Sequence, residues 1–128
     1  MTEDDFQKIE RDLNVSLPKA YRDVMPAFEK LSAKQMDYVC LYQSAARVVD
    51  ANNEARDLAR IGWEWPDKYL IVGDNGGGNA FCLDLSNPDD TWVWWCDHER
   101  NCEFSRFEEI GQFVASEIED ILQDDDLK

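Results

Sequence analysis

The apolar residues at the N-terminal end of the chain recur at helical spacing and predict two amphipathic helices. The first helix starts at a capping box, in which Thr2 and Asp5 each satisfy a free backbone donor. The second helix begins near Pro18, because proline is tolerated in a first helical turn. Pro26 is expected to kink or divide this second helix, since it removes a backbone hydrogen bond. The residues that set the spacing are Phe6, Ile9, Leu13, Tyr21, Val24, Met25, Phe28 and Leu31.

Between residues 37 and 66 the pattern changes twice. Residues 37–42 alternate, which predicts a short strand with two tyrosines and Cys40 on one side. Residues 44–60 return to helical spacing, are rich in alanine, and predict a central helix. Residues 61–66 contain glycine, proline and two tryptophans and are expected to end that helix as a loop.

The centre of the chain predicts an antiparallel β-meander. Residues 69–72 form a continuous apolar run, as expected for a strand that is buried on both faces. Residues 80–85 alternate like a half-buried strand, and residues 91–96 place tryptophan on both faces of a third strand. Turn-forming residues occupy 74–79 and 86–90, so each strand is expected to pair with the next one.

A final helix is predicted from Ser105, because Ser105 and Glu108 have the spacing of a second capping box. Its apolar spacing comes from Phe107, Ile110, Val114, Ile118 and Ile121. Aspartates at its end oppose the negative pole of the helix dipole, so residues 124–128 are expected to fray. The pattern predicts one α+β domain over residues 1–128, with N-terminal, central and C-terminal helices packed on a mainly antiparallel sheet of about four or more strands.

The composition adds a strong negative charge to this picture. The 128 residues include 28 acidic and 13 basic side chains, which gives a formal net charge of −15, and 44% are hydrophobic, enough for a folded core. Residues 1–64 carry a net charge of −3 and residues 65–128 carry −12. Nucleic acids and anionic membranes are therefore unsuitable partners, since they are bound through lysine and arginine. The excess indicates either a solvated surface with an acidic tail or an acidic face for a basic partner.

The cellular compartment is predicted from what the sequence lacks. The N-terminal residues contain no basic start and no apolar run, and no segment approaches the about 20 apolar residues of a membrane span. We therefore expect a cytoplasmic protein. Its four cysteines, Cys40, Cys82, Cys96 and Cys102, are then expected to be free thiols.

Three motifs suggest ligand chemistry, and each has a simpler structural interpretation. The glycines at 76–78 lead into a strand and no lysine follows them, so a hairpin turn explains them better than a phosphate loop. Cys96, His98 and Cys102 resemble part of a zinc site, but structural zinc takes four ligands. His98 is also the only imidazole, yet no nucleophile accompanies it in a recognisable arrangement. The sequence therefore predicts no catalytic residue, no metal and no cofactor.

Four segments resemble, in order, motifs of the SUKH superfamily, which includes bacterial toxin-immunity proteins and fungal cell-wall-synthesis regulators. The segments are similar to an L-P-x-x-Y-R signature, a glycine-rich hairpin, a strand that ends in D-H-E, and a closing helix. The matching residues are Leu13, Leu17, Pro18, Tyr21, Arg22, residues 71–79, Phe81, Leu83, Asp84, Val93, residues 97–99, Phe107, Glu108, Ile110 and Phe113. The resemblance spans residues 6–121, although little of residues 32–66 aligns.

The resemblance implies an α+β domain that binds a protein and has no catalytic activity. Many bacterial members look like immunity proteins that neutralise a cognate toxin, frequently a nuclease. The basic cleft of a nuclease would complement the acidic second half of this chain. The alternative is a regulatory or scaffold module without a toxin partner, and a third hypothesis is a hydrolase or metal protein centred on His98.

Seven residues are predicted to contact the protein partner. Five of them lie where the meander would place its hairpin ends, and two tryptophans lie in the loop beside Pro66. Tryptophan is enriched at binding hot spots because it buries a large area at low rotamer cost, although core packing is the alternative for any single one. The predicted contacts are Asp74, Asn75, Asp97, His98, Glu99, Trp63 and Trp65.

Overall fold

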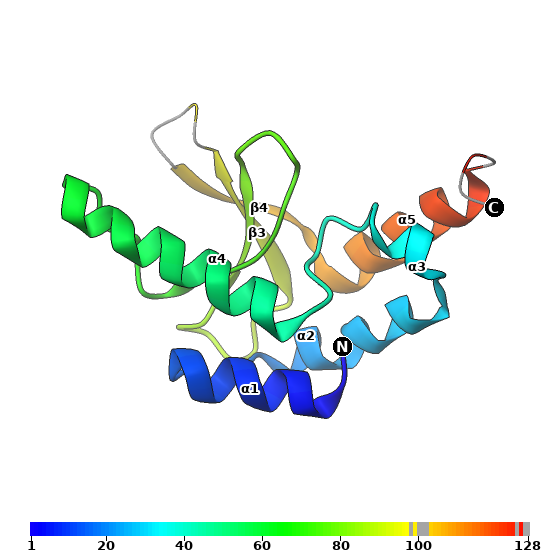
Figure 1. The fold of residues 1–128 in the computed structure, drawn as a ribbon, viewed down its shortest axis with the longest axis horizontal. Helices are drawn as coiled ribbons and strands as arrows, with labels where there is room; N and C mark the ends of the chain where they lie inside the picture. Colours follow the sequence, from blue (N-terminus) through cyan, green and yellow to red (C-terminus); the bar gives the residue numbers. More distant parts are fainter. Residues whose placement is uncertain (98, 100–102, 125, 127–128) are drawn as a thin grey trace.

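The computed structural model describes residues 1–97, 99, 103–124 and 126, and its centre is a four-stranded antiparallel sheet with helices packed around it (Figure 1). The strands are β1 (Tyr69–Asp74), β2 (Ala80–Asp84), β3 (Trp92–Asp97) and β4 (Glu103–Glu109). The helices are α1 (Glu3–Leu13), α2 (Lys19–Val24), α3 (Ala33–Met36), α4 (Ala45–Asp57) and α5 (Ile110–Gln123), with two 3₁₀ segments, η1 (Met25–Lys30) and η2 (Leu58–Ile61). The strand order is β1-β2-β3-β4, so the predicted α+β class and the antiparallel meander are confirmed.

The N-terminal helices form as their sequence predicts. The Thr2 hydroxyl accepts the Asp5 N–H, and the Asp5 carboxylate accepts the Thr2 N–H at 2.9 Å, which completes the capping box of α1. Pro26 divides the second helix, because α2 ends at Val24 and η1 continues the chain as a 3₁₀ segment. Arg22 of α2 joins α2 to α1 by ion pairs with Glu3 and Glu10.

The main core lies on one face of the sheet, between the strands and helices α1, α2 and α5. In Figure 1, α1 and α2 lie along the bottom of the molecule, α4 crosses it above α1, and α5 lies to the right. The helices contribute side chains from the predicted apolar faces, and the strands contribute alternate residues. The strand residues in this core are Leu70, Val72, Phe81, Leu83 and Val93.

A second, smaller cluster covers the opposite face of the sheet. Its buried residues are Ala55, Tyr69, Ile71, Cys82 and Cys96. Alternate residues of β1 therefore enter different clusters, which confirms that the apolar run at 69–72 is a strand buried on both faces. Helix α4 reaches both clusters, since its N-terminal half packs in the main core and its C-terminal half packs in the second cluster.

The strand predicted at residues 37–42 is wrong. In this segment only Leu41 forms a β-bridge, with Gly73 of β1, and a short helix, α3, precedes it. The Tyr42 N–H donates to the Val72 carbonyl at 2.8 Å, and the Asp74 N–H donates to the Cys40 carbonyl at 3.1 Å. The segment thus touches the outer edge of β1 at one point without becoming a strand.

The side chain of Asn52 satisfies the backbone hydrogen-bonding groups of Ile71, on the same edge of β1. Asn52 of α4 is 3% exposed, and its Nδ2 donates to the Ile71 carbonyl at 2.9 Å and to the Val48 carbonyl at 2.7 Å. Its Oδ1 accepts the Ile71 N–H at 2.8 Å. Asn52 thus takes the place on the β1 edge where Gln43 would continue the pairing, and the 40–42 segment meets β1 only near its end at Asp74.

The helix start predicted at Ser105 is also wrong. Residues 103–109 form β4, in which Ser105 lies opposite Trp95, and α5 begins at Ile110. Glu109 caps α5, because its carboxylate accepts the N–H groups of Gly111 at 3.0 Å and Gln112 at 2.9 Å. α5 ends at Gln123, before the acidic tail, of which residues 125, 127 and 128 lie outside the described residues.

The helices of the described residues are too short or too polar to cross a membrane.

Candidate protein-binding surface

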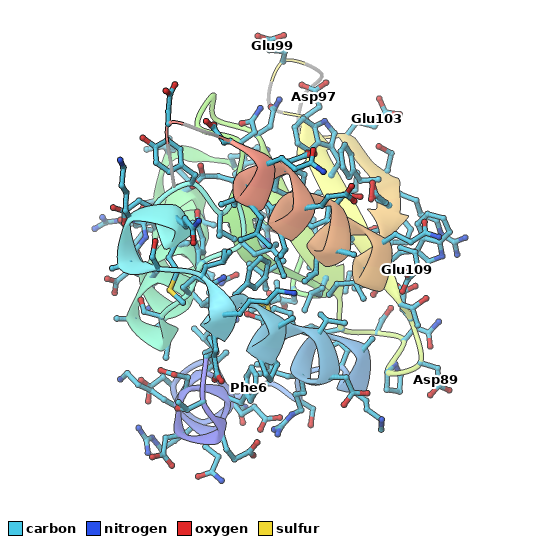
Figure 2. All side chains as sticks on the ribbon, turned by 90° about the vertical axis from the view of Figure 1, so that its right-hand side faces the viewer. Phe6, Asp89, Asp97, Glu99, Glu103 and Glu109 are labelled. Atoms are coloured by element: carbon cyan, nitrogen blue, oxygen red, sulfur yellow. The ribbon has the colours of Figure 1, made fainter. Side chains whose placement is uncertain are left out.

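The β1–β2 hairpin and the ends of β3 and β4 lie at the same end of the sheet. Asp74 is paired with Ala80, Ala80 with Cys96, and Asp97 with Glu103. Figure 2 shows Asp97, Glu99 and Glu103 close together at this end of the molecule. The structure thus gathers the predicted hairpin-end contacts, apart from His98, which lies outside the described residues.

The side chains of Asp74 and Asn75 organise the β1–β2 hairpin. The Asp74 carboxylate accepts the Tyr42 hydroxyl at 2.7 Å and the Gly76 N–H at 2.8 Å. Burial, with the Asp74 carboxylate beside it, raises the pKa of Tyr42. The Asn75 side chain accepts the N–H of Gly77 at 2.9 Å. Since Gly76 has a φ of 79°, the glycines serve a hairpin turn, as the sequence predicts.

A hollow of about 760 Å³ lies between α4, η2 and the sheet. Its lining includes small side chains from both sides, Ala51 and Ala55 of α4 and Ala80 and Cys96 of the strands. Residues 51 and 55 are one helical turn apart and so lie on the same face of α4. Because four of the lining side chains are small, space remains between the helix and the strands.

Large apolar side chains form the wall of this hollow. Leu58 and Ile61 come from η2, and the Ile61 side chain is 79% exposed. Trp63 and Trp65 follow in the loop, with their rings edge to face at a centroid distance of 5.6 Å. Both tryptophans are half-buried, and the Trp65 indole N–H donates to the Tyr69 carbonyl at 2.7 Å. The wall is therefore aromatic and partly open to solvent.

Aromatic packing holds Trp65 in place. The Trp65 ring meets Phe104 of β4 edge to face at 5.3 Å, and Phe104 stacks on Tyr69 of β1 at 4.0 Å with an interplanar angle of 5°. Trp94 of β3 also packs against Tyr69, at 5.7 Å. These rings span three strands of the sheet, so the position of Trp65 depends on the sheet as well as on its own loop.

Two carboxylates line the hollow. Glu54 lies on α4 and is exposed, and Asp74 lies at the end of β1. The structure thus brings together three of the predicted contacts, Asp74, Trp63 and Trp65, around one apolar space. Sequence reasoning missed Glu54, Leu58 and Ile61, although their spacing of four and three residues is typical of one helix face.

The ion pairs of the described structure all lie in the first half of the chain. They are Lys8–Asp12, Arg11–Asp12, Lys19–Asp23, Arg22–Glu3, Arg22–Glu10 and Arg60–Asp57. In the second half, Lys68 lies over the Tyr69 ring at 5.0 Å and Arg106 lies over the Trp92 ring at 5.2 Å. Leaving Asp97 aside, no carboxylate after residue 64 in the described part of the chain pairs with lysine or arginine.

Several acidic side chains form a series along one side of the molecule. In Figure 2, Glu99 and Glu103 lie at the top with Asp97, and Glu109 and Asp89 follow further down the same side. Glu109 is engaged in capping α5, whereas Asp89, Glu99 and Glu103 are exposed. The side of the molecule formed by the later strands is therefore acidic.

The environment of Cys40 and the grouping of possible metal ligands bear on the zinc and nucleophile hypotheses. Burial and the neighbouring Glu117 raise the pKa of the Cys40 thiol to about 12, which disfavours the reactive thiolate. Among the described residues, no three histidine, cysteine or acidic side chains are grouped to hold a metal ion. His98 and Cys102, on which the zinc interpretation depends, lie outside them.

Comparison with known proteins identifies a family. The model of the SMI1 / KNR4 family (SUKH-1) matches residues 1–124, which include every helix and strand and the whole hollow. Searches of curated proteins and of solved structures each gave no match. The family match covers nearly all of the chain, and we conclude that the chain belongs to the SMI1 / KNR4 family (SUKH-1).

Proposed function

We propose that this protein is a non-enzymatic binding domain that captures a basic protein, in the manner of an immunity protein that neutralises a toxin. The observation that carries the proposal is the charge of the second half of the chain. Its net charge is −12, and its described cations lie over aromatic rings instead of against carboxylates. A surface of this kind attracts a cationic partner from a distance and accelerates its association.

A nuclease toxin fits the chemistry of this surface. Such an enzyme needs a basic cleft, since its substrate carries a phosphate on every nucleotide. An acidic protein that occupies the cleft excludes the substrate and needs no catalytic group of its own. The family to which the chain belongs is compatible with this proposal, because the SUKH superfamily that the chain resembles includes bacterial toxin-immunity proteins beside fungal regulators. We place this action in the cytoplasm, where free thiols such as Cys40 persist.

The proposal is tested with the product of the gene beside the one that encodes this protein. That product is expressed in a host strain with and without the protein, and growth is followed. Growth arrest that the protein relieves would support the immunity function. A harmless product that still binds would overturn that function in favour of the regulatory module.

The electrostatic part of the proposal is tested by calorimetry on the purified pair. We expect the affinity to fall at least tenfold between 50 and 500 mM salt, because screening weakens attraction between exposed charges. The test variant neutralises three exposed carboxylates of the second half, Asp89→Asn, Glu99→Gln and Glu103→Gln.

A matched control removes the same charge from the first half, by Glu29→Gln, Asp37→Asn and Asp50→Asn, which are also exposed. The two variants have equal net charge, so only the position of the lost carboxylates differs. Weaker binding by the first variant alone supports capture through the second half. Equal affinities, or an affinity that salt does not change, would contradict it.

A further inference from the structure

The hollow beside α4 has an apolar lining that nothing in the described protein covers. Ile61 projects from η2 with most of its side chain exposed, next to the half-buried ring of Trp63. Isoleucine is among the residues most often buried, so an exposed isoleucine beside a concave aromatic wall is unusual. The volume of about 760 Å³ lies within the range of roughly 300–1,000 Å³ that is typical of ligand sites.

The charge at the hollow restricts what can enter it. Glu54 is exposed on α4 and has no ion pair or hydrogen bond within the described residues. The Asp74 carboxylate is held in place by the Tyr42 hydroxyl and the Gly76 N–H. Arg47 lies over the Tyr42 ring at 4.8 Å, but it lines the neighbouring hollow and not this one. An anionic group would therefore be repelled, and a purely apolar one would bury the Glu54 carboxylate without a partner.

Arginine combines the properties that this lining requires. Its aliphatic stem can cover Ile61 and Leu58, and its planar guanidinium can stack on the Trp63 indole while donating to the Glu54 carboxylate. The molecule already contains an arrangement of this kind, because Arg106 lies over both Trp92 and Trp94. Lysine lacks the flat, weakly hydrated head group that suits an aromatic face.

We propose that this hollow is a binding site for an arginine side chain of the basic protein partner. The inference rests on the proposed function, and it adds the residue that the partner inserts. The acidic side formed by the later strands would then draw the partner in, and the hollow would hold one of its arginines beside Trp63 and Glu54.

The first experiment uses a small probe and does not need the partner. Nα-acetyl-arginine methylamide is titrated into the isotope-labelled protein, and the indole N–H resonances of Trp63 and Trp65 are followed by NMR. We expect saturable shifts in the millimolar range. The citrulline analogue, which is neutral and has nearly the same shape, should bind at least fivefold more weakly. Equal shifts with both probes, or none at Trp63, would overturn the proposal.

Two variants locate the site, and each has a matched control. Ile61→Ser and Glu54→Gln should each weaken arginine binding about three- to tenfold, because both side chains line the hollow. Both are exposed, so the fold is expected to tolerate the changes. The controls are Leu122→Ser, which also replaces an exposed aliphatic side chain by serine, and Glu119→Gln, which also neutralises an exposed glutamate; both lie on α5. Unaltered arginine binding in both hollow variants would overturn the assignment.

The same variants separate this inference from the proposed function. If the partner binds the wild-type protein and both hollow variants with equal affinity, the arginine site is wrong and the proposed function stands. If the neighbouring gene product does not bind while the arginine probe does, the proposed function fails and the arginine site is supported.

Discussion

Asn52 replaces a neighbouring strand for one residue of β1. Its amide group accepts from and donates to the backbone of Ile71, and it also donates to the Val48 carbonyl within its own helix. An asparagine amide has the same donor and acceptor pair as a peptide group, so it can satisfy a strand edge. Nothing in the local pattern of residues 44–60 reveals this role, because it depends on a strand that follows 19 residues later.

The first prediction concerns this side chain. Asn52→Ala leaves the N–H and the carbonyl of Ile71 buried without partners, and each such loss costs about 1–3 kcal/mol. We therefore expect the free energy of unfolding in urea to fall by about 2–4 kcal/mol. Asn53→Ala is the control, because Asn53 is exposed on the same helix, and it should change the stability by less than about 0.5 kcal/mol. Equal losses in the two variants would contradict this role of Asn52.

Glu117 of α5 is a second polar residue with a buried contact. Its Oε1 accepts the Cys40 N–H at 2.7 Å, while Oε2 is buried and has no hydrogen-bond partner among the described residues. Burial raises the pKa of Glu117 and outweighs the hydrogen bond from Cys40, which lowers it. The folded protein therefore holds this proton more tightly than the unfolded chain does, and ionisation of Glu117 favours unfolding.

This difference in pKa predicts how stability depends on pH. The stability from protonated Glu117 is present below the ordinary glutamate pKa of 4.5 and is lost as the pH rises through the higher pKa of the folded protein. Compared with Glu117→Gln, the wild type should therefore lose stability as the pH rises above 4.5, as measured by urea unfolding. Glu119→Gln, an exposed neighbour on α5, should show no such difference. A difference in the free energy of unfolding between the wild type and Glu117→Gln that does not change with pH would contradict the raised pKa of Glu117.

Among the elements, the two capping boxes show what a local pattern can and cannot decide. The Thr2–Asp5 box forms, because α1 has no neighbouring strand that competes for its backbone. The Ser105–Glu108 box does not form, because β3 lies opposite residues 103–109 and supplies their hydrogen bonds. The strand predicted at 37–42 failed for a different reason, since Leu41 meets β1 at Gly73, one residue before that strand ends at Asp74, and residues 37–39 run past its end.

The candidate site was predictable to a similar extent. Trp63, Trp65 and Asp74 were identified from their positions in a loop and a hairpin, and the structure places all three around one hollow. The hollow itself was not predictable, because it exists where Ala55 of α4 packs near Ala80 of β2, two residues that are far apart in the sequence. In a single sequence, an alanine does not indicate whether a hollow lies beside it in the folded protein.

The contact between Gly73 and the 40–42 segment gives a prediction at this scale. A Cβ at position 73 would lie 2.4 Å from the Cys40 carbonyl oxygen and 3.0 Å from the Leu41 Cα. Gly73→Ala should therefore push the segment off β1 and reduce stability by about 1–3 kcal/mol in urea unfolding. Gly77→Ala is the control, since its Cβ would meet only the Asn75 side chain, at 3.5 Å or more. A Gly73→Ala protein as stable as Gly77→Ala would contradict this close packing.

For the whole molecule, the unequal distribution of charge is the dominant property. Residues 1–64 carry ion pairs on α1, α2 and η2, whereas residues 65–128 carry a net charge of −12 that is spread over the strands, the loops between them, α5 and the acidic tail. Exposed ion pairs contribute only about 0–1 kcal/mol each. We therefore expect repulsion within the second half to outweigh these ion pairs in the response of the free protein to salt.

This repulsion predicts that salt stabilises the free protein. The melting temperature should rise by a few degrees between about 50 and 500 mM NaCl, because the Debye length falls from roughly 14 Å to 4 Å and screens the carboxylates from one another. Scanning calorimetry measures the change. The variant Asp89→Asn, Glu99→Gln, Glu103→Gln should show a smaller rise, and a melting temperature that falls with salt would contradict the prediction.

The outer edge of β1 is partly covered by Asn52 and residues 40–42, and this has a consequence during synthesis of the chain on the ribosome. The groups that occupy this edge, Asn52 and residues 40–42, precede β1 in the sequence, so they emerge from the ribosome before β1 does. An exposed strand edge is a template for aggregation with other chains. During synthesis β1 therefore has its own edge-covering partners available first, and the nascent chain is protected at the strand that is most apolar.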